Sequence, residues 1–259
     1  MRGIRLACVL RIAILLVLPG HAAFAEDPGI ASRLGSAVLS DFDRFYLQKG
    51  NLVPLGAGLA GAGILANTSA DREVREFWQE RLRGRDTDRV AKVAKIPGTA
   101  LVTGPAYLGA YGAGRMLENE TLETWAVRSA RATLVGTPGA LALQRLTGGG
   151  RPENGDSGWR PFKSSHGLSG HAFIGGVPLI TAAKMSDDPY LKGAFYALST
   201  LPGLSRINDD AHYFSQAALG WFVAYLSCDT VSKGKDVDGG RASFRLTPFP
   251  GGIGAIARF

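Results

Sequence analysis

The chain has 259 residues, 46% of them hydrophobic, and a formal net charge of +7. This length supports one sizeable hydrophobic core, and no change of composition divides the chain, so we predict a single domain. The basic residues are interleaved with acids, which argues against a nucleic-acid partner. One cysteine, Cys8, lies in the N-terminal leader and the other, Cys228, lies in an apolar segment. The processed chain then has no internal disulfide, and Cys228 is predicted to be a small core residue.

Residues 1–25 have the organisation of a secretory signal peptide. Arg2 and Arg5 precede an apolar run over 12–18, and Ala23-Phe24-Ala25 has the small-x-small form that signal peptidase accepts. The run is shorter than the roughly 20 residues of a spanning helix, which favours cleavage over a retained membrane anchor. We therefore expect an exported protein, periplasmic or membrane-associated, whose mature domain covers 26–259.

Apolar residues recur at three- and four-residue spacing through most of the mature chain, which predicts an all-α fold. The helices expected from this spacing cover 27–49, 50–70, 96–114, 119–146, 169–186, 190–203 and 212–231. A polar helix is expected to begin with a capping box at Thr68 and Asp71 and to carry arginines as far as Arg85. Near the C-terminus, two apolar stretches at 244–246 and 253–256 flank Pro-Gly-Gly and predict a short β-hairpin.

Two of the expected helices, 50–70 and 96–114, carry no charge until Asp71 ends the first and Arg115 ends the second. Both are long enough to cross a bilayer, but glycines, prolines and polar residues dilute their hydrophobicity. We favour a soluble or peripherally membrane-bound bundle. The glycines at 56, 58 and 61 match a dinucleotide-binding pattern, which we reject because no strand precedes them.

Outside the leader, the chain has only three histidines, His166, His171 and His212, and all lie in or beside segments rich in arginine and glycine. Segment 144–152 reads QRLTGGGRP, segment 166–171 reads HGLSGH, and segment 205–216 reads SRINDDAHYFSQ. Imidazole can act near neutrality as nucleophile, acid or base, so this pattern indicates reactive chemistry on an anion.

In their order and internal spacing, the three segments resemble the signature of the type 2 phosphatidic acid phosphatase and vanadium haloperoxidase superfamily. That signature is Lys, six residues, Arg-Pro; then Pro-Ser-Gly-His; then Ser-Arg, five residues, His, three residues, Asp. The resemblance covers about residues 140–220. It implies a helical bundle of the acid phosphatase and haloperoxidase type.

The resemblance also implies a phosphate site. Arg151 and Arg206 would hold phosphate oxygens, joined by Ser169 and the Gly170 amide. The chemistry of these residues agrees with such roles, because a guanidinium fork fits two phosphate oxygens and a Ser-Gly pair that opens a helix offers amides and the positive end of its dipole.

By the same resemblance, His212 would attack phosphorus to form a phosphohistidine and His171 would be the general acid, with no metal required. His166 lies five residues before His171, outside the signature, and either lines the pocket or caps a loop. The three glycines at 148–150 lack the Lys-Ser/Thr of a nucleotide phosphate loop, so we interpret them as a turn that delivers Arg151.

The chain departs from the signature in its first two segments, with Gln144 in place of the lysine and Leu168 in place of the proline. Gln144 can donate a hydrogen bond but carries no charge, and Arg145 and Lys163 are nearby substitutes. Leu168 is expected to alter the rigidity of the turn more than the chemistry.

In the third segment, Gln216 replaces the aspartate that would orient His212. Its amide oxygen can accept the ring N–H and set the tautomer, but cannot stabilise an imidazolium by charge. Reduced activity is one expectation, and compensation by Asp209 or Asp210 is another. The alternative for these two acids is an ordinary place at a helix N-terminus.

The favoured function is a phosphatase acting on a phosphate ester or on a lipid phosphate or diphosphate, with membrane contact possible and no cofactor. The alternatives are a phosphate-binding homologue weakened by Gln144 and Gln216, a haloperoxidase that uses vanadate in the same site, and a zinc hydrolase built from the three histidines and an aspartate. The sequence does not identify the substrate or the oligomeric state.

Overall fold

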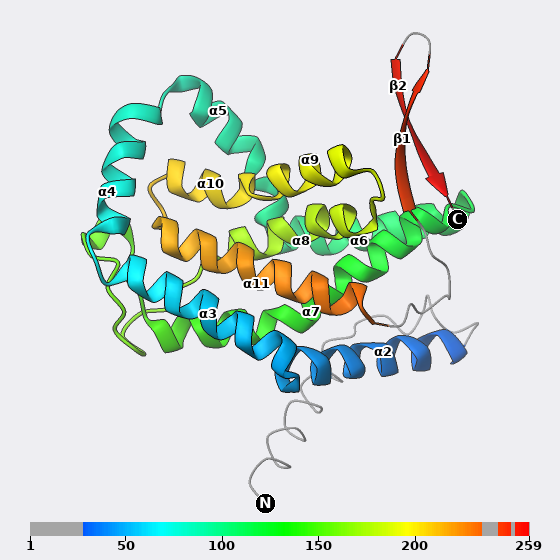
Figure 1. Ribbon diagram of the computed structural model, residues 1–259, viewed down its shortest axis with the longest axis horizontal. Helices are drawn as coiled ribbons and strands as arrows, with labels where there is room; N and C mark the ends of the chain where they lie inside the picture. Colours follow the sequence, from blue (N-terminus) through cyan, green and yellow to red (C-terminus); the bar gives the residue numbers. More distant parts are fainter. Residues whose placement is uncertain (1–27, 235–242, 250–251, 259) are drawn as a thin grey trace, which may run out of the picture.

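Three helices, α7 (Glu120–Thr147), α8 (Gly170–Met185) and α11 (Phe214–Ser232), form the centre of the molecule (Figure 1). The computed structural model describes residues 28–234, 243–249 and 252–258, so the signal peptide predicted at 1–25 lies outside the described residues. Phe173 of α8 and Leu219 of α11 are buried in the core between these helices. Gly220 lets α11 approach the start of α8, because a Cβ there would overlap the carbonyl oxygen of Ser169. Cys228 is buried and free, as the sequence predicted.

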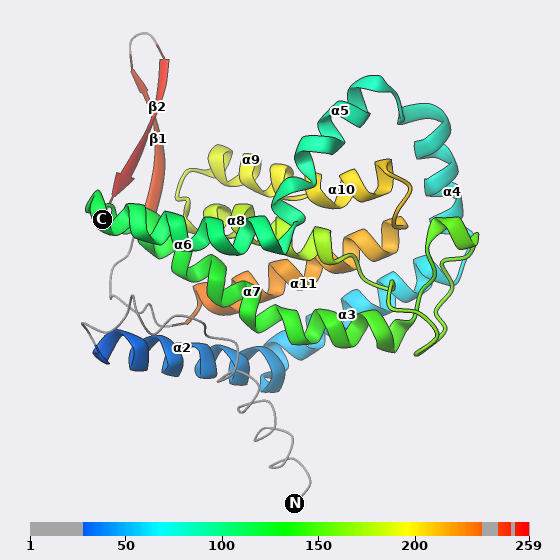
Figure 2. The ribbon, with the colours of Figure 1, turned by 180° about the vertical axis from the view of Figure 1, so that it is seen from behind.

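The other helices surround this centre. They are α2 (Pro28–Leu47), α3 (Lys49–Ala66), α4 (Ala70–Phe77), the π-helix η1 (Trp78–Leu82), α5 (Arg85–Ala94), the 3₁₀ turns η2 (Ile96–Gly98) and η3 (Pro152–Asn154), α6 (Ala100–Met116), α9 (Pro189–Ser199) and α10 (Leu201–Asn208). Helices α4 and α5 form an arch at one end, and the loop that follows α7 lies at that same end (Figures 1 and 2). The described residues are mostly helical, which confirms the all-α prediction.

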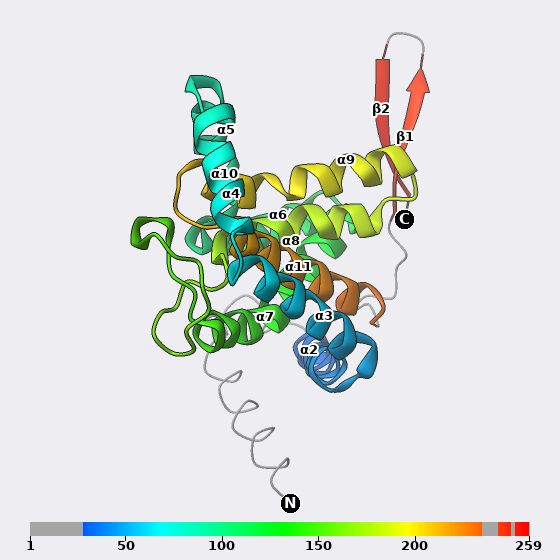
Figure 3. The same cartoon turned by 60° about the vertical axis from the view of Figure 1, so that its left-hand side comes forward.

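A β-hairpin follows the helices. Strands β1 (Ser243–Phe249) and β2 (Gly252–Arg258) pair antiparallel, with Ser243 opposite Arg258 and Phe249 opposite Gly252. The hairpin lies where the sequence predicted it. It stands at the end of the molecule away from α4 and α5 (Figure 3).

Two of the predicted helices are in fact divided. The polar helix was expected to run to Arg85, but the chain becomes extended at Gly84, where the backbone N–H bonds the Thr87 hydroxyl at 2.8 Å and α5 begins anew. The helix expected over 190–203 is α9 and α10, because Pro202 lacks an N–H and suits the first turn of a new helix.

The prediction of a capping box at Thr68 and Asp71 is wrong. The side chain of the N-cap residue of α4, Ser69, makes no capping bond, and Thr68 donates to the Ile64 carbonyl instead. Asp71 is fully buried and accepts from the amide of Ser215 at 2.8 Å and from its hydroxyl at 2.5 Å. Asp71 therefore ties α4 to the first turn of α11, next to the third motif segment.

Among the described helices, none alone has both the length and the apolarity needed to cross a bilayer. Helix α3 together with the α4–η1 segment meets those limits only as a pair, bent by 71°.

Candidate active site

Gln216 joins the three motif segments. Its side chain is fully buried on α11. Its backbone carbonyl accepts from the amide of Ser169 at 2.9 Å, its Nε2 donates to the carbonyl of Gly150 at 2.6 Å, and its Oε1 lies 2.8 Å from Nδ1 of His212. One residue of the third segment thus contacts the first, the second and the imidazole of its own segment.

These bonds assign the tautomer of His212. Oε1 of Gln216 also accepts from the amide of Tyr213 at 3.3 Å, while Nε2 is committed to Gly150. Because both ends of the amide are used, its oxygen faces the ring, and the neutral imidazole donates from Nδ1. The lone pair of His212 is then on Nε2, the nitrogen that points away from Gln216.

Burial keeps His212 neutral. The residue is 9% exposed. Desolvation by burial lowers the pKa of His212 to about 4, with smaller contributions from Arg206 and Arg151, and the hydrogen bond to Gln216 opposes the shift only in part. At neutral pH the ring is therefore an uncharged base with a free nitrogen, which is the form that a nucleophile requires.

Ser169, Gly170 and His171 open α8, as the sequence predicted. Ser169 is the N-cap, and its hydroxyl accepts from the amide of Ala172 at 3.3 Å. The N-terminus of this 16-residue helix supplies amides and a positive dipole end to the site. Leu168, which stands where the resemblance expects proline, is fully buried and anchors the turn by packing.

Gln144, in the last turn of α7, lies beside this helix N-terminus. Its Nε2 donates to the carbonyl of Leu168 at 3.1 Å and lies 3.6 Å from the position that a Cβ of Gly170 would occupy. One amide hydrogen is therefore used to hold the turn before Ser169. The second can face an anion at the helix N-terminus.

Arg151 and Arg206 each have an unsatisfied donor inside the protein. The Nε atoms of both are buried and have no hydrogen-bond partner among the described residues. A buried unpaired donor costs about 1–3 kcal/mol, more on a charged group, so these N–H groups favour a bound acceptor. The left-handed backbone at Gly148, with φ of 60°, ends α7 and turns the chain towards Arg151, which confirms the predicted turn.

His171 differs from His212 because it is only half-buried and lies among charges. Burial lowers the pKa of His171, Arg206 and then Lys95 lower it further, and Asp209 opposes them. Lys95 lies at the C-terminal end of α5 and could not be predicted as part of the site, because no motif surrounds it in the sequence.

The two acids of the third segment have other roles than those considered from sequence. Asp209 and Asp210 follow the C-terminus of α10, so their interpretation as helix N-terminal acids is wrong. Oδ2 of Asp209 lies 3.0 Å from Arg206 and 3.1 Å from Lys95. Asp210 forms two bonds to Arg75, at 2.6 and 2.7 Å. Neither carboxylate takes the place of the missing aspartate, since the Nδ1 position of His212 belongs to Gln216.

His166 interacts electrostatically with Arg151 and His212. Its Nδ1 lies 2.9 Å from the hydroxyl of Ser164. Its pKa is lowered by burial and then by Arg151, and His166 in turn contributes to the lowered pKa of His212. Both open readings of this residue are therefore compatible with its position, which is next to Arg151 and held within its loop.

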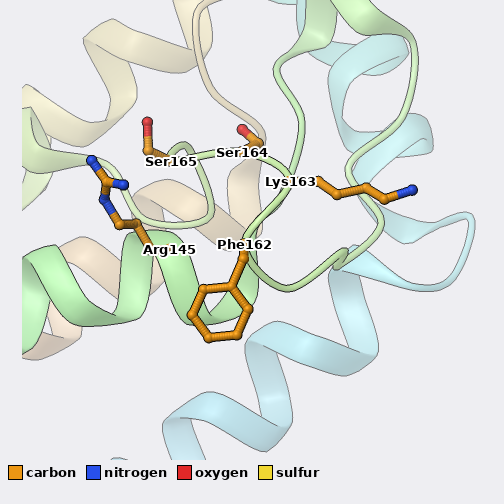
Figure 4. A pocket seen from close by; sticks show the side chains of 5 residues that line it. All are labelled: Arg145, Phe162, Lys163, Ser164 and Ser165. Atoms are coloured by element: carbon orange, nitrogen blue, oxygen red, sulfur yellow. The ribbon is translucent and has the colours of Figure 1, made fainter.

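Arg145 and Lys163, the suggested substitutes for the missing lysine, line a shallow pocket of about 240 Å³ with Phe162, Ser164 and Ser165. Figure 4 shows the two cationic side chains pointing away from each other. Both residues are exposed. They do not converge on one anion.

The described residues contain no group of three or more His, Cys, Asp or Glu side chains placed to hold a metal ion. The zinc alternative therefore gains no support from this part of the chain. No protein-family model, curated protein or solved structure matches the chain.

Proposed function

We propose that this chain is an exported, metal-independent phosphatase that hydrolyses a phosphate ester or a lipid phosphate or diphosphate through a phosphohistidine. The observation that carries the proposal is the bonding of Gln216, which joins Gly150, Ser169 and His212. It brings the arginine after Gly150, the N-terminus of α8 and a neutral imidazole to one site. The helical bundle supports a fold of the acid phosphatase type.

Binding would begin at the two arginines. Arg151 and Arg206 each offer a buried donor that has no partner, and a phosphate group brings a charge of about −1.5 to −2 with several acceptor oxygens. The amides that open α8 add donors at the same place. These fixed charges and dipoles stabilise the charge of the transferring group, which is the task a metal performs in other phosphatases.

The chemistry would take two steps. Nε2 of His212 attacks phosphorus in line, the bond from phosphorus to the ester oxygen breaks, and His171 gives its proton to the leaving oxygen. His171 then accepts a proton from water, whose oxygen attacks the phosphohistidine and frees His212 and phosphate. Burial, and then the charges of Arg206 and Lys95, lower the pKa of His171 in the free protein. The general acid is protonated at acidic pH, so we expect an acidic pH optimum, and the bound phosphate dianion opposes this shift.

The test is phosphate release by the mature protein in the presence of a chelator, with soluble esters and lipid phosphates compared side by side. We expect release by the wild type and loss of at least about 10³-fold in His212→Asn, since an amide cannot act as this nucleophile. Acid-labile labelling by a substrate carrying labelled phosphate should appear in the wild type and not in the variant. Release that persists in His212→Asn would overturn the mechanism.

A second candidate is a phosphate-binding protein with little turnover, and the neutral amide of Gln216 beside His212 is the observation that favours it. It predicts that the wild type binds inorganic phosphate or orthovanadate but releases no phosphate from any ester. Peroxide-dependent halide oxidation by the vanadate-treated protein would instead support the haloperoxidase alternative.

Export is a separate element of the proposal, based on residues 1–25. The N-terminal sequence of the protein purified from the producing cell tests it. A mature chain beginning at Glu26 is expected, and a chain that retains the leader would contradict cleavage.

A further inference from the structure

A cation outside the three motif segments lies at the His171 side of the site. Nζ of Lys95 is 3.1 Å from Oδ2 of Asp209, and a guanidinium nitrogen of Arg206 is 3.0 Å from the same oxygen. Two positive groups from different elements, the end of α5 and the last turn of α10, therefore converge on one acceptor atom. A phosphate oxygen is an acceptor of the same kind with a higher charge.

The backbone holds Lys95 next to His171. The carbonyl of Lys95 accepts from the amide of Gly98 at 3.0 Å. Gly98 packs directly on His171, because a Cβ at that glycine would lie 2.9 Å from the Cα and Cβ atoms of the histidine. The turn after α5 is thus fitted against the first turn of α8, and this contact requires glycine at position 98. The charge of Lys95 is also one cause of the lowered pKa of His171.

A bound phosphate dianion needs more positive charge than the motif segments supply. The motif segments supply Arg151 and Arg206, while Gln144 and Gln216 are neutral. Asp209 offsets part of the positive charge, so the two arginines alone leave a bound phosphate dianion incompletely balanced. Lys95 supplies the third positive charge. Its side chain is 38% exposed, which leaves Nζ free to move from Asp209 to a ligand.

We propose that Lys95 is a phosphate-binding residue of this site, held beside Arg206 by Asp209 until a phosphate oxygen bonds both cations. The inference depends on the proposed phosphate site and adds to it a residue from a different part of the chain. Lys95, at the C-terminal end of α5, supplies the positive charge that the neutral Gln144 does not.

Binding of inorganic phosphate to the mature protein, measured by calorimetry, tests this inference apart from turnover. In Lys95→Gln we expect the dissociation constant to rise about tenfold, the loss of one charge-assisted hydrogen bond. Lys95→Arg should recover most of the affinity. Lys92→Gln removes an exposed lysine from the same helix and should leave the affinity unchanged. The pKa of His171, followed by NMR, should rise in Lys95→Gln and stay constant in Lys92→Gln.

The outcomes separate the two proposals. Phosphate affinity in Lys95→Gln within twofold of the wild type, in a variant with unchanged helical content, would overturn the role of Lys95. A wild type that binds phosphate but hydrolyses no ester would overturn the phosphatase proposal, and the binding comparison would still decide the role of Lys95. A wild type that binds no phosphate would overturn both.

Discussion

The two imidazoles of the candidate site have opposite surroundings. His212 is 9% exposed, is bonded to a neutral amide, and has its pKa lowered to about 4 mainly by burial. His171 is half-buried and lies near Arg206, Lys95 and Asp209, whose charges act on its pKa in both directions. One side of the site is a neutral hydrogen-bond network, and the other side is a cluster of ions.

This difference in surroundings fits the roles proposed for the two histidines, nucleophile for His212 and general acid for His171. A nucleophile needs one tautomer and a fixed direction, and buried hydrogen bonds with both partners satisfied provide them. A general acid must change its charge in each cycle, so it needs access to solvent and neighbours whose charges respond to the bound anion. Substitutions and changes of pH can test this contrast between the network of His212 and the ion cluster of His171.

Removing the amide of Gln216 should have the largest effect. Gln216→Leu leaves the Gly150 carbonyl, the Tyr213 amide and Nδ1 of His212 without their partner. We expect a loss of about 3 kcal/mol in the free energy of unfolding, because buried polar groups are left unsatisfied. Phosphate release should fall by about 10²-fold or more, since the tautomer of His212 is no longer set. Urea unfolding and steady-state kinetics measure the two effects.

Gln216→Glu is the matched variant, because it keeps the shape and adds a charge. The carboxylate would raise the pKa of His212, which NMR can follow, but would place an oxygen against the Gly150 carbonyl. We expect an intermediate stability and more activity than in Gln216→Leu. If Gln216→Leu were as active as the wild type, the network would have no part in orienting the imidazole.

The pH dependence of stability should report the burial of His212. Its folded pKa of about 4 lies below the ordinary 6.5, so the unfolded chain binds the proton first. This contribution is fully present above about pH 6.5, is lost as the pH falls towards 4, and amounts to about 3 kcal/mol. Urea unfolding between pH 7 and 4 should therefore show a steeper loss in the wild type than in His212→Asn. Parallel curves for the two proteins would contradict a buried neutral His212.

The sequence predicted the members of the site better than the contacts between them. His171, His212, Arg151 and Arg206 follow from the spacing within short segments, and Ser169 follows from its place before a helix, because these are local properties. The contact of Gln216 with His212 was predicted from their spacing, and the structure confirms it. The contacts of Gln216 with Gly150 and Ser169 could not be predicted, since they depend on two segments more than 40 residues away reaching the same residue.

Other contacts were missed because they join distant segments through ordinary residues. Lys95 precedes a Pro-Gly turn with no recognised motif, and only the packing of Gly98 on His171 brings it to the site. Asp71 has the spacing of a local cap but instead binds the first turn of α11. An acidic residue that bonds a distant helix has the same local sequence pattern as one that caps its own helix.

On the ion-cluster side, Asp209→Asn should have a moderate effect of the opposite sign. The amide no longer competes with phosphate for Arg206 and Lys95, so we expect phosphate to bind about threefold more tightly. The pKa of His171 should fall further, because Asp209 raises it at present. Calorimetry and NMR titration measure the two changes. Weaker phosphate binding in Asp209→Asn would mean that the carboxylate mainly positions the two cations.

The smallest effect is expected at the cations of the shallow pocket. Arg145 on α7 and Lys163 on the following loop are exposed, and their side chains point away from each other (Figure 4). The cations that lower the histidine pKa values are instead Arg151, Arg206 and Lys95. Charges in high-dielectric surroundings are screened, so Arg145→Gln and Lys163→Gln should each change KM by less than about twofold. A tenfold rise in KM in either variant would show that this pocket belongs to the substrate site. The charge missing at position 144 would then come from Arg145 or Lys163 and not from Lys95.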